Sequence, residues 1–196
     1  FCAIVPVLMW STWLHAGYWK NNITLFSHAI ETTSNNYTAH SSLGIALCDI
    51  GEYDSAIPYF KEALRINPAY MKANNNLGAA LVKLGRYQEA TEHFKQVIRI
   101  DPSNFNAHYN LGHALNALGK VDEAIKQYKK SLSLDPDSAQ ALQGLEETLK
   151  KQQMINDAIG QIRQSLQFDP NNYALHYKLA ELYSSKGDEK GAGMHY

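Results

Sequence analysis

Apolar residues recur at helical spacing through the segment 71–104, in two runs separated by Gly85. Side chains three and four positions apart share one face of an α-helix, so each run predicts a helix with one apolar face. Glycine can adopt the left-handed conformation that ends a helix, and Pro102 stops the second run because the residue before a proline is pushed out of the helical region. The segment is therefore predicted to be a helix, a tight turn and a second helix. Its inward positions are Leu77, Ala80, Leu81, Leu84, Ala90, Phe94, Val97 and Ile98.

The same segment recurs along the chain with a period of 34 residues. A proline marks the turn that ends a unit, and an alanine marks each second helix. A fixed period of this length is the signature of stacked helical hairpins, in which each hairpin packs on its neighbours. The 196 residues are therefore predicted to form one elongated all-α domain. The recurring residues are Pro68, Pro102, Pro136 and Pro170, and Ala56, Ala90, Ala124, Ala158 and Ala192.

Three units share further residues in register. They are Leu77-Gly78, Gly85, Tyr87, Ala90, Phe94 and Pro102; Leu43-Gly44, Gly51, Tyr53, Ala56, Phe60 and Pro68; and Leu111-Gly112, Gly119, Ala124, Tyr128 and Pro136. This pattern resembles the tetratricopeptide repeat (TPR). The resemblance implies a right-handed superhelix, or α-solenoid, of helix-turn-helix repeats, with small residues such as Gly78 where two helices cross closely.

The repeat register predicts the domain organisation. The fourth full unit departs from the pattern, because Gln153 replaces the turn glycine, Glu146 replaces the small residue at the helix crossing and Ile162 replaces the aromatic residue. We expect weaker packing in that unit. The predicted segments are an apolar segment 1–16, a divergent half repeat 17–36, TPRs at 37–70, 71–104 and 105–138, a divergent TPR 139–172 and an incomplete TPR 173–196.

The apolar segment at the N-terminus has two interpretations. Residues 1–14 carry no charge but fall short of the roughly 20 residues that span a bilayer. The run could be the end of a transmembrane helix with an aromatic belt at Trp10, Trp13, Tyr18 and Trp19, or a buried capping helix of a degenerate repeat. The first interpretation predicts an extracytoplasmic domain attached to a membrane, and the second predicts a cytoplasmic one.

The segment 18–44 carries a second resemblance. It is similar to the junction in multi-pass membrane glycosyltransferases of the O-mannosyltransferase-like type, where the last membrane helix leads into a TPR array. This resemblance implies an alternative function, the substrate- or partner-recognition arm of such an enzyme.

The net charge and the reactive residues indicate which classes of function are not expected. A net charge of −1 leaves no dominant basic stripe, so no nucleic-acid partner is expected. Cys2 and Cys48 show neither metal-ligand nor disulfide spacing. His40, His108 and His176 recur at one repeat position and are interpreted as packing residues. The sequence shows no nucleophile with its base, phosphate loop or carboxylate pair, so no catalytic site, metal or cofactor is predicted.

The candidate binding surface is the outward face of each first helix. At about 100° per residue this face lies opposite the core leucine, and stacked TPR hairpins turn their first helices toward the concave side. Asn76 and Asn110 also resemble the asparagine ladder of the O-GlcNAc transferase family, although Ser42, Gly144 and Lys178 interrupt it. The predicted groove residues are Lys72, Asn75, Asn76, Asn106, Tyr109, Asn110, His113 and Asn116, with Gln140, Gln143, Glu147 and Lys150 at the same places in the next repeat.

These positions predict a protein-protein interaction scaffold that binds an extended peptide or a partner helix in a concave groove. Amide side chains can pair with a peptide backbone whatever its sequence. A clamp for a C-terminal carboxylate needs several basic residues, and the groove has only Lys72 beside Asn75 and Asn76. We therefore expect a protein or peptide partner that is not held by such a clamp. The sequence makes no prediction of oligomeric state.

Overall fold

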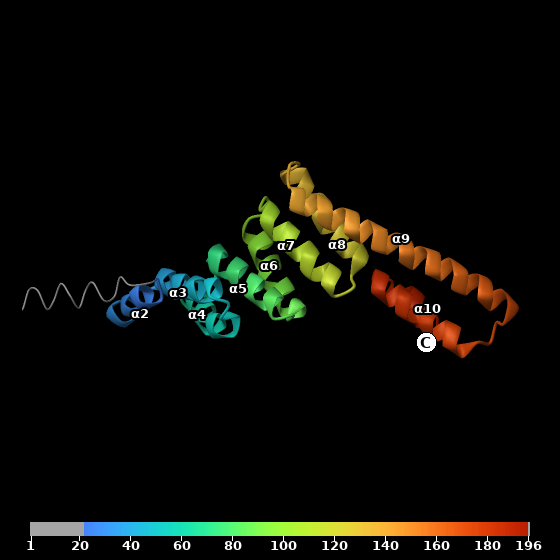
Figure 1. Ribbon diagram of the computed structural model, residues 1–196, viewed down its shortest axis with the longest axis horizontal. Coiled ribbons are helices and arrows are strands. Elements are labelled where there is room, and N and C mark those ends of the chain that lie inside the picture. The colour runs from blue at the N-terminus through green and yellow to red at the C-terminus, as the bar shows by residue number, and fades with distance from the viewer. Residues whose placement is uncertain (1–21, 196) are drawn as a thin grey trace, which may run out of the picture. The chain divides into compact units, whose positions relative to one another are not determined.

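The computed structural model describes residues 22–195, and every regular element in that range is an α-helix (Figure 1). This confirms the predicted all-α fold of repeated helices. The segment 1–16 lies outside the described residues, so its two interpretations stay predictions. None of the described helices is both long and apolar enough to cross a membrane. The helices are α2 (Asn22–Thr32), α3 (Tyr37–Asp49), α4 (Tyr53–Ile66), α5 (Met71–Lys83), α6 (Tyr87–Ile100), α7 (Phe105–Ala117), α8 (Val121–Leu134), α9 (Ala139–Phe168), α10 (Tyr173–Lys186) and α11 (Glu189–Gly193).

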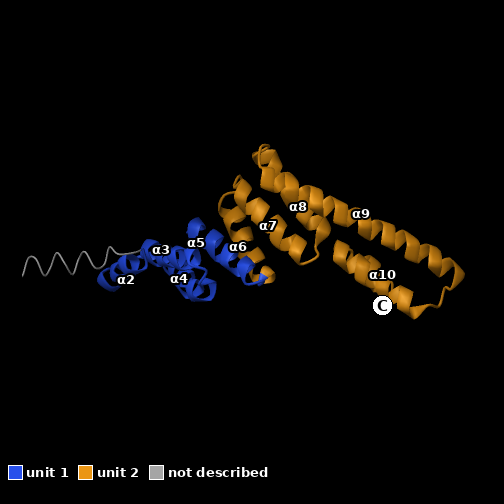
Figure 2. Ribbon diagram, in the orientation of Figure 1, with its two compact units in different colours: residues 1–86 blue, residues 87–196 orange. Residues whose placement is uncertain are grey.

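The chain divides into two compact units, residues 1–86 and residues 87–196 (Figure 2). In unit 1, helices α2, α3, α4 and α5 pack consecutively. In unit 2, helices α6 to α11 do the same. Consecutive packing of neighbouring helices is the arrangement of an α-solenoid.

The α3–α4 hairpin of unit 1 shows how the repeat sequence produces this structure. The Asn36 side chain accepts a hydrogen bond of 2.9 Å from the Ala39 backbone N–H and caps the start of α3. The turn to α4 passes through Gly51, whose φ of 84° lies in the left-handed region. Where the helices cross, a Cβ on Gly44 would lie 2.7 Å from the Phe60 ring. The close crossing therefore requires glycine at position 44.

The α7–α8 hairpin of unit 2 is built in the same way. The Asn104 side chain caps α7 by accepting a hydrogen bond of 3.0 Å from the Ala107 N–H. Tyr128 takes the place that Phe60 holds in unit 1, and it is among the most buried large side chains. The Ser131 hydroxyl, also buried, donates a 2.9 Å hydrogen bond to the carbonyl of the first residue of α7. These contacts fix α8 against α7.

The divergent repeat at 139–172 differs from a helix-turn-helix unit. Its two expected helices are one continuous helix, α9, of 30 residues. Gln153 stands at the turn position, and its neighbours are strong helix formers, so nothing in the local sequence ends the helix there. The Gln152 amide also donates to the Asp122 carboxylate at the start of α8. The expected close crossing at Glu146 therefore does not form, and that side chain is exposed.

The second half of α9 packs through one apolar cluster. Ile155, Ile159 and Ile162 lie three or four positions apart in the second half of α9 and share one cluster with residues of α8, α10 and α11. In Figure 1, α10 runs back beside the second half of α9. The Lys186 ammonium at the end of α10 donates a hydrogen bond of 2.9 Å to the side-chain oxygen of Asn156. The cluster contains Val121, Ile125, Ile155, Ile159, Ile162, Leu179, Tyr183 and Ala192, with Leu145 and Leu166 at its edge.

The continuous helix leaves part of the divergent repeat uncovered. Leu142 and Leu149 are 49% and 40% exposed, whereas the equivalent His108 and Leu115 on α7 are 6% and 3% exposed. On α7 this face is covered by α8, but α9 continues straight and has no second helix of its own repeat to fold back over it. The weaker packing expected in this repeat therefore takes the form of an uncovered helix face.

Two of the three recurring histidines bind the preceding turn, whereas His40 stacks on the Tyr59 ring and its buried Nδ1 has no hydrogen-bond partner among the described residues. His108 Nε2 lies 3.2 Å from the Pro102 carbonyl oxygen, and His176 Nε2 lies 2.9 Å from that of Pro170. A carbonyl oxygen only accepts, so Nε2–H is the donor in both rings. His108 is also buried and within 2.8 Å of the Gln127 side chain, which confirms its packing role.

Candidate functional site

The predicted groove residues divide between the two units. Lys72, Asn75 and Asn76 lie on α5 in unit 1, where Lys72 is exposed and the two asparagines are half-buried. Asn76 lines a hollow together with apolar residues of α3 and α4 and the charged side chains Asp49 and Lys83. Lys72 lines a separate hollow with residues of α2 and α3. Unit 1 therefore does not bring Lys72 and Asn76 into one site.

Unit 2 brings three of the predicted α7 residues together with Gln140, Gln143 and Glu147, which were expected at the same places in the next repeat, whereas Lys150 does not line the hollow that they share. A hollow of about 340 Å³, called the α7–α9 hollow below, lies between the two first helices of neighbouring repeats. Tyr109, His113 and Asn116 form its α7 side, whereas Asn106 and Asn110 on the same helix are not part of its lining. The remaining lining residues are Tyr87, Ala117, Tyr128, Gln140, Gln143, Gly144 and Glu147.

Tyr128 is the lining residue that the sequence pattern assigned only to the core. Its ring is buried between two glycines, because a Cβ on Gly112 would lie 3.0 Å from the ring and one on Gly144 would lie 2.8 Å from it. The hydroxyl end reaches Gly144, at the place where Asn76 and Asn110 stand in their repeats. The sequence signal was the joint change from phenylalanine to Tyr128 and from asparagine to Gly144.

Aromatic rings form one wall of the α7–α9 hollow. The Tyr109 ring centre lies 6.0 Å from that of Tyr128 and 6.5 Å from that of His113, both at tilted angles. Tyr109 and His113 are one turn apart on α7, so the helix itself places them side by side. The wall offers both ring faces and polar ring substituents to a bound molecule.

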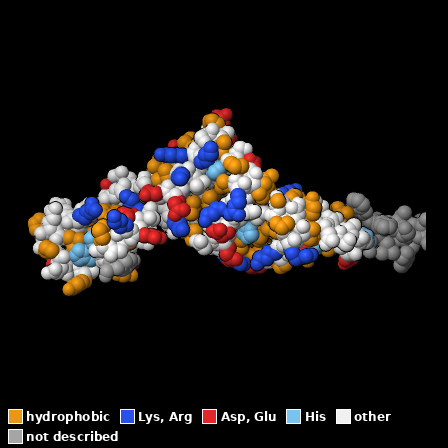
Figure 3. All heavy atoms as spheres, turned by 180° about the vertical axis from the view of Figure 1, so that it is seen from behind, with side chains coloured by type: hydrophobic (Ala, Val, Ile, Leu, Met, Phe, Trp, Pro, Cys, Tyr) orange, Lys and Arg blue, Asp and Glu red, His pale blue; other side chains and the backbone are white. Residues whose placement is uncertain are grey.

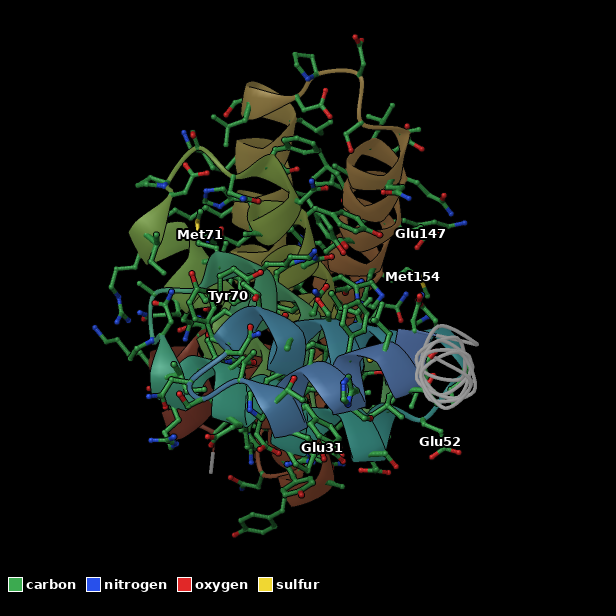
Figure 4. All side chains as sticks on the ribbon, turned by 90° about the vertical axis from the view of Figure 1, so that its left-hand side faces the viewer. Glu31, Glu52, Tyr70, Met71, Glu147 and Met154 are labelled. Atoms are coloured by element: carbon green, nitrogen blue, oxygen red, sulfur yellow. The ribbon has the colours of Figure 1, made fainter. Side chains whose placement is uncertain are left out.

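Polar side chains of α7 and α9 complete the lining of the α7–α9 hollow. Glu147 Oε1 accepts a 2.8 Å hydrogen bond from the Gln143 side chain, and Glu147 projects from α9 to the surface (Figure 4). Asn116 Oδ1 is buried and has no hydrogen-bond partner among the described residues. The Lys151 ammonium donates a hydrogen bond of 3.3 Å to the backbone carbonyl of Asn116, not to its side chain. An unpaired buried acceptor is costly, so Asn116 is suited to a ligand that donates a hydrogen bond.

The charge of this hollow differs from that of the unit 1 hollow. Glu147 is its one carboxylate, and no Lys or Arg is among the residues that line it. Burial, then the neighbouring Tyr109 and Glu147, raises the pKa of Tyr128, so its hydroxyl stays protonated and able to donate. The lining therefore combines hydrogen-bonding groups with one negative charge.

The described part of the chain has three other features that bear on function: its cysteine, its possible metal ligands and its surface charge. Burial, and secondarily Asp49, raises the pKa of the Cys48 thiol, which keeps it protonated and poorly nucleophilic. Among residues 22–195 no group of three or more His, Cys, Asp or Glu side chains is placed to hold a metal ion. On the face shown in Figure 3, basic and acidic side chains are interspersed rather than gathered into a stripe.

Family models identify these repeats. A TPR repeat model matches residues 46–85 and 80–119, and a tetratricopeptide repeat model matches residues 105–138. The chain is a TPR protein. A comparison with curated proteins gave no match.

Solved structures agree with the TPR fold. YrrB, a TPR protein with an unusual peptide-binding site, is 21% identical with a TM-score of 0.60, over 87% of this chain and 88% of that chain. The second TPR domain of human RPAP3, in complex with the HSP70 peptide SGPTIEEVD, is 28% identical with a TM-score of 0.54, over 56% of this chain and 91% of that one. The Sgt2 TPR domain from Aspergillus fumigatus is 27% identical with a TM-score of 0.59, over 62% and 82% of the two chains.

Proposed function

We propose that this TPR protein is a protein-interaction scaffold and that it holds an extended peptide in the α7–α9 hollow. The observation that carries the proposal is the convergence of Tyr109, His113 and Asn116 from α7 with Gln140, Gln143 and Glu147 from α9 on one open hollow. Two of the similar TPR structures, YrrB and the human RPAP3 domain, are described with a peptide-binding site or a bound peptide, which supports a peptide as the ligand.

The side chains of the hollow suit a peptide backbone. An amide side chain offers two donors and an acceptor, and Asn116, which lines the hollow, has a buried side-chain oxygen without a hydrogen-bond partner among the described residues. A peptide N–H is a donor of the right kind for that oxygen. The tilted rings of Tyr109 and Tyr128 provide apolar surface for a peptide side chain. Both helices are rigid elements, so the site is held in place before the peptide arrives.

The charge of the hollow also says which peptides it disfavours. A C-terminal carboxylate preceded by acidic residues, as in the peptide bound to the human RPAP3 domain, requires cations. Glu147 would repel such a peptide, and no Lys or Arg lines the hollow to offset it. The ligand of this hollow is therefore an internal peptide segment or a neutral to basic one.

A selection from a displayed library of random 12-residue peptides tests the proposal. We expect the intact chain to recover peptides that bind it in solution, and Asn116→Ala to weaken the affinity for them by about two- to tenfold, the size of one lost hydrogen bond. Tyr109→Ala should weaken it further. Lys129→Ala, an exposed change on α8, is the matched control and should leave binding unchanged. Equal binding by a Tyr109→Ala/Asn116→Ala double variant would overturn the proposal.

A further inference from the structure

The lining of the α7–α9 hollow favours positively charged groups over negatively charged ones. Its wall contains the aromatic rings of Tyr87, Tyr109, His113 and Tyr128, and its one charged lining residue is Glu147. Rings present a negative face to a cation, and a carboxylate adds a full negative charge close by. Both features attract a positive group.

We propose that this hollow is a subsite for a lysine or arginine side chain of the bound peptide, held between the Tyr109 ring and the Glu147 carboxylate. The inference rests on the proposed function, because it names which peptides the same hollow selects. The cation would lie against the aromatic wall while its N–H groups reach the α9 side.

Hydrogen-bond acceptors in the hollow match the donors of such a side chain. Arginine carries five N–H donors and lysine three, and neither carries an acceptor. Asn116 Oδ1 is buried without a partner among residues 22–195, and in the same range Glu147 accepts one hydrogen bond, from the Gln143 side chain to its Oε1. A cationic donor would satisfy the asparagine oxygen and the carboxylate together. An acidic or purely apolar side chain would satisfy neither.

Two lysines follow Glu147 within four positions on α9, Lys150 and Lys151, and neither forms an ion pair with it among the described residues. Lys151 lies one turn beyond Glu147 on α9, but its ammonium donates to the Asn116 backbone carbonyl at the end of α7. Glu146, the neighbour of Glu147, is exposed and does not line the hollow. Glu147 is thus the carboxylate available to a ligand, and Glu146 is a natural control of the same charge.

The experiment uses the full chain and peptides recovered from the 12-residue library, resynthesised with each arginine replaced by citrulline or each lysine by glutamine. Citrulline keeps the shape of arginine and removes its charge. We expect the recovered peptides to be enriched in lysine or arginine, and neutral replacement to weaken binding about tenfold. Glu147→Gln should weaken binding of the charged peptides about two- to fivefold, the size of a solvent-exposed ion pair. Glu146→Gln should leave it unchanged.

The outcomes separate the two proposals. If peptides bind in the hollow but show no enrichment in lysine or arginine, or bind Glu147→Gln and Glu146→Gln alike, the cationic subsite is wrong and the peptide-binding function stands. If no peptide is recovered, or the recovered peptides bind the Tyr109→Ala/Asn116→Ala variant as well as the unchanged chain, both proposals fail. Binding that weakens with added salt in the unchanged chain, and less so in Glu147→Gln, supports the subsite independently.

Discussion

Tyr128 and Gly144 form the side-chain pair on which the α7–α9 hollow depends. The Tyr128 ring fills the helix crossing at Gly112, and its hydroxyl end occupies the space that a side chain at position 144 would need. Because position 144 is glycine, no side chain of α9 covers the Tyr128 hydroxyl at this place. One residue thus serves both the core and the candidate site, which is why a core assignment from helical spacing found only half of its role.

Gly144→Ala tests this pairing. A Cβ at position 144 would lie 2.8 Å from the Tyr128 ring, so we expect the variant to lose about 1–3 kcal/mol of unfolding free energy by overpacking. Gly160→Ala on the same helix is the control, because a Cβ there meets nothing within 4 Å. It should gain about 0.5–1 kcal/mol from helix propensity. Thermal unfolding compares the two, and equal stability of both variants would contradict the close packing of Tyr128 against Gly144.

A second residue-scale prediction concerns the histidine pair at the end of the described chain. His176 Nδ1 and His195 Nδ1 lie 3.0 Å apart, and His176 already donates through Nε2 to Pro170. When the His176 ring is neutral, its Nδ1 therefore accepts and His195 Nδ1–H donates. Burial, then His176 and Arg163, lowers the pKa of His195, so the unfolded chain binds its proton more readily than the folded one.

Folded-state stability should therefore decrease as the pH falls below about 6.5, the unfolded histidine value, and level off below the lowered pKa of His195. Thermal unfolding between pH 7.5 and pH 5, roughly the range over which histidine titrates, measures this change. His195→Gln should make the profile flatter. A variant profile that matches the unchanged protein would show that another group causes the pH dependence.

At the scale of elements, α9 is where repeat register and observed structure differ. Ala158 and Pro170 keep the 34-residue register, so the period alone predicts a hairpin at 139–172. The register cannot predict whether the chain turns, because turning depends on a residue that accepts the left-handed conformation. Gly51, Gly85 and Gly119 all have positive φ at that position, and Gln153 does not.

The other repeats were predictable for the same reason. Their turn glycines, crossing glycines and terminal prolines are local signals with one structural meaning each. The lining of the α7–α9 hollow was predictable in part, since helical direction placed Tyr109, His113 and Asn116 outward. It could not show that Asn106 and Asn110 stay outside the hollow, because the lining also depends on how the next repeat packs.

Amide hydrogen exchange tests the continuity of α9. A continuous helix predicts that the amides at 152–156 are protected about as strongly as those of the preceding turn, since each is bonded within the helix. Gln153→Gly should lower helix stability locally by about 0.5–1 kcal/mol and speed exchange there. Gln164→Gly, exposed on the same helix, controls for a general effect of glycine. Fast exchange confined to two or three amides near 153 in the unchanged chain would instead indicate a hairpin turn.

At the scale of the whole molecule, the TPR fold would allow a chain with a net charge of −1 to bind a partner selectively. Each repeat places one outward helix face beside the next, so a site arises from residues far apart in sequence. In unit 2 this brings Asn116 and Gln143 into one hollow, although 27 positions separate them. Function then depends on which side chains occupy those faces, because the repeat core itself is shared by proteins with different partners.

Backbone amide shifts of the ¹⁵N-labelled chain, titrated with a peptide recovered from the library, test the central claim most directly. Binding in the α7–α9 hollow predicts saturable shift changes centred on Tyr109, His113 and Asn116 of α7 and on Gln143 and Glu147 of α9. Changes centred instead on the outward face of α8, around Lys126 and Lys129, or on the exposed residues of α10, would contradict a peptide site between α7 and α9.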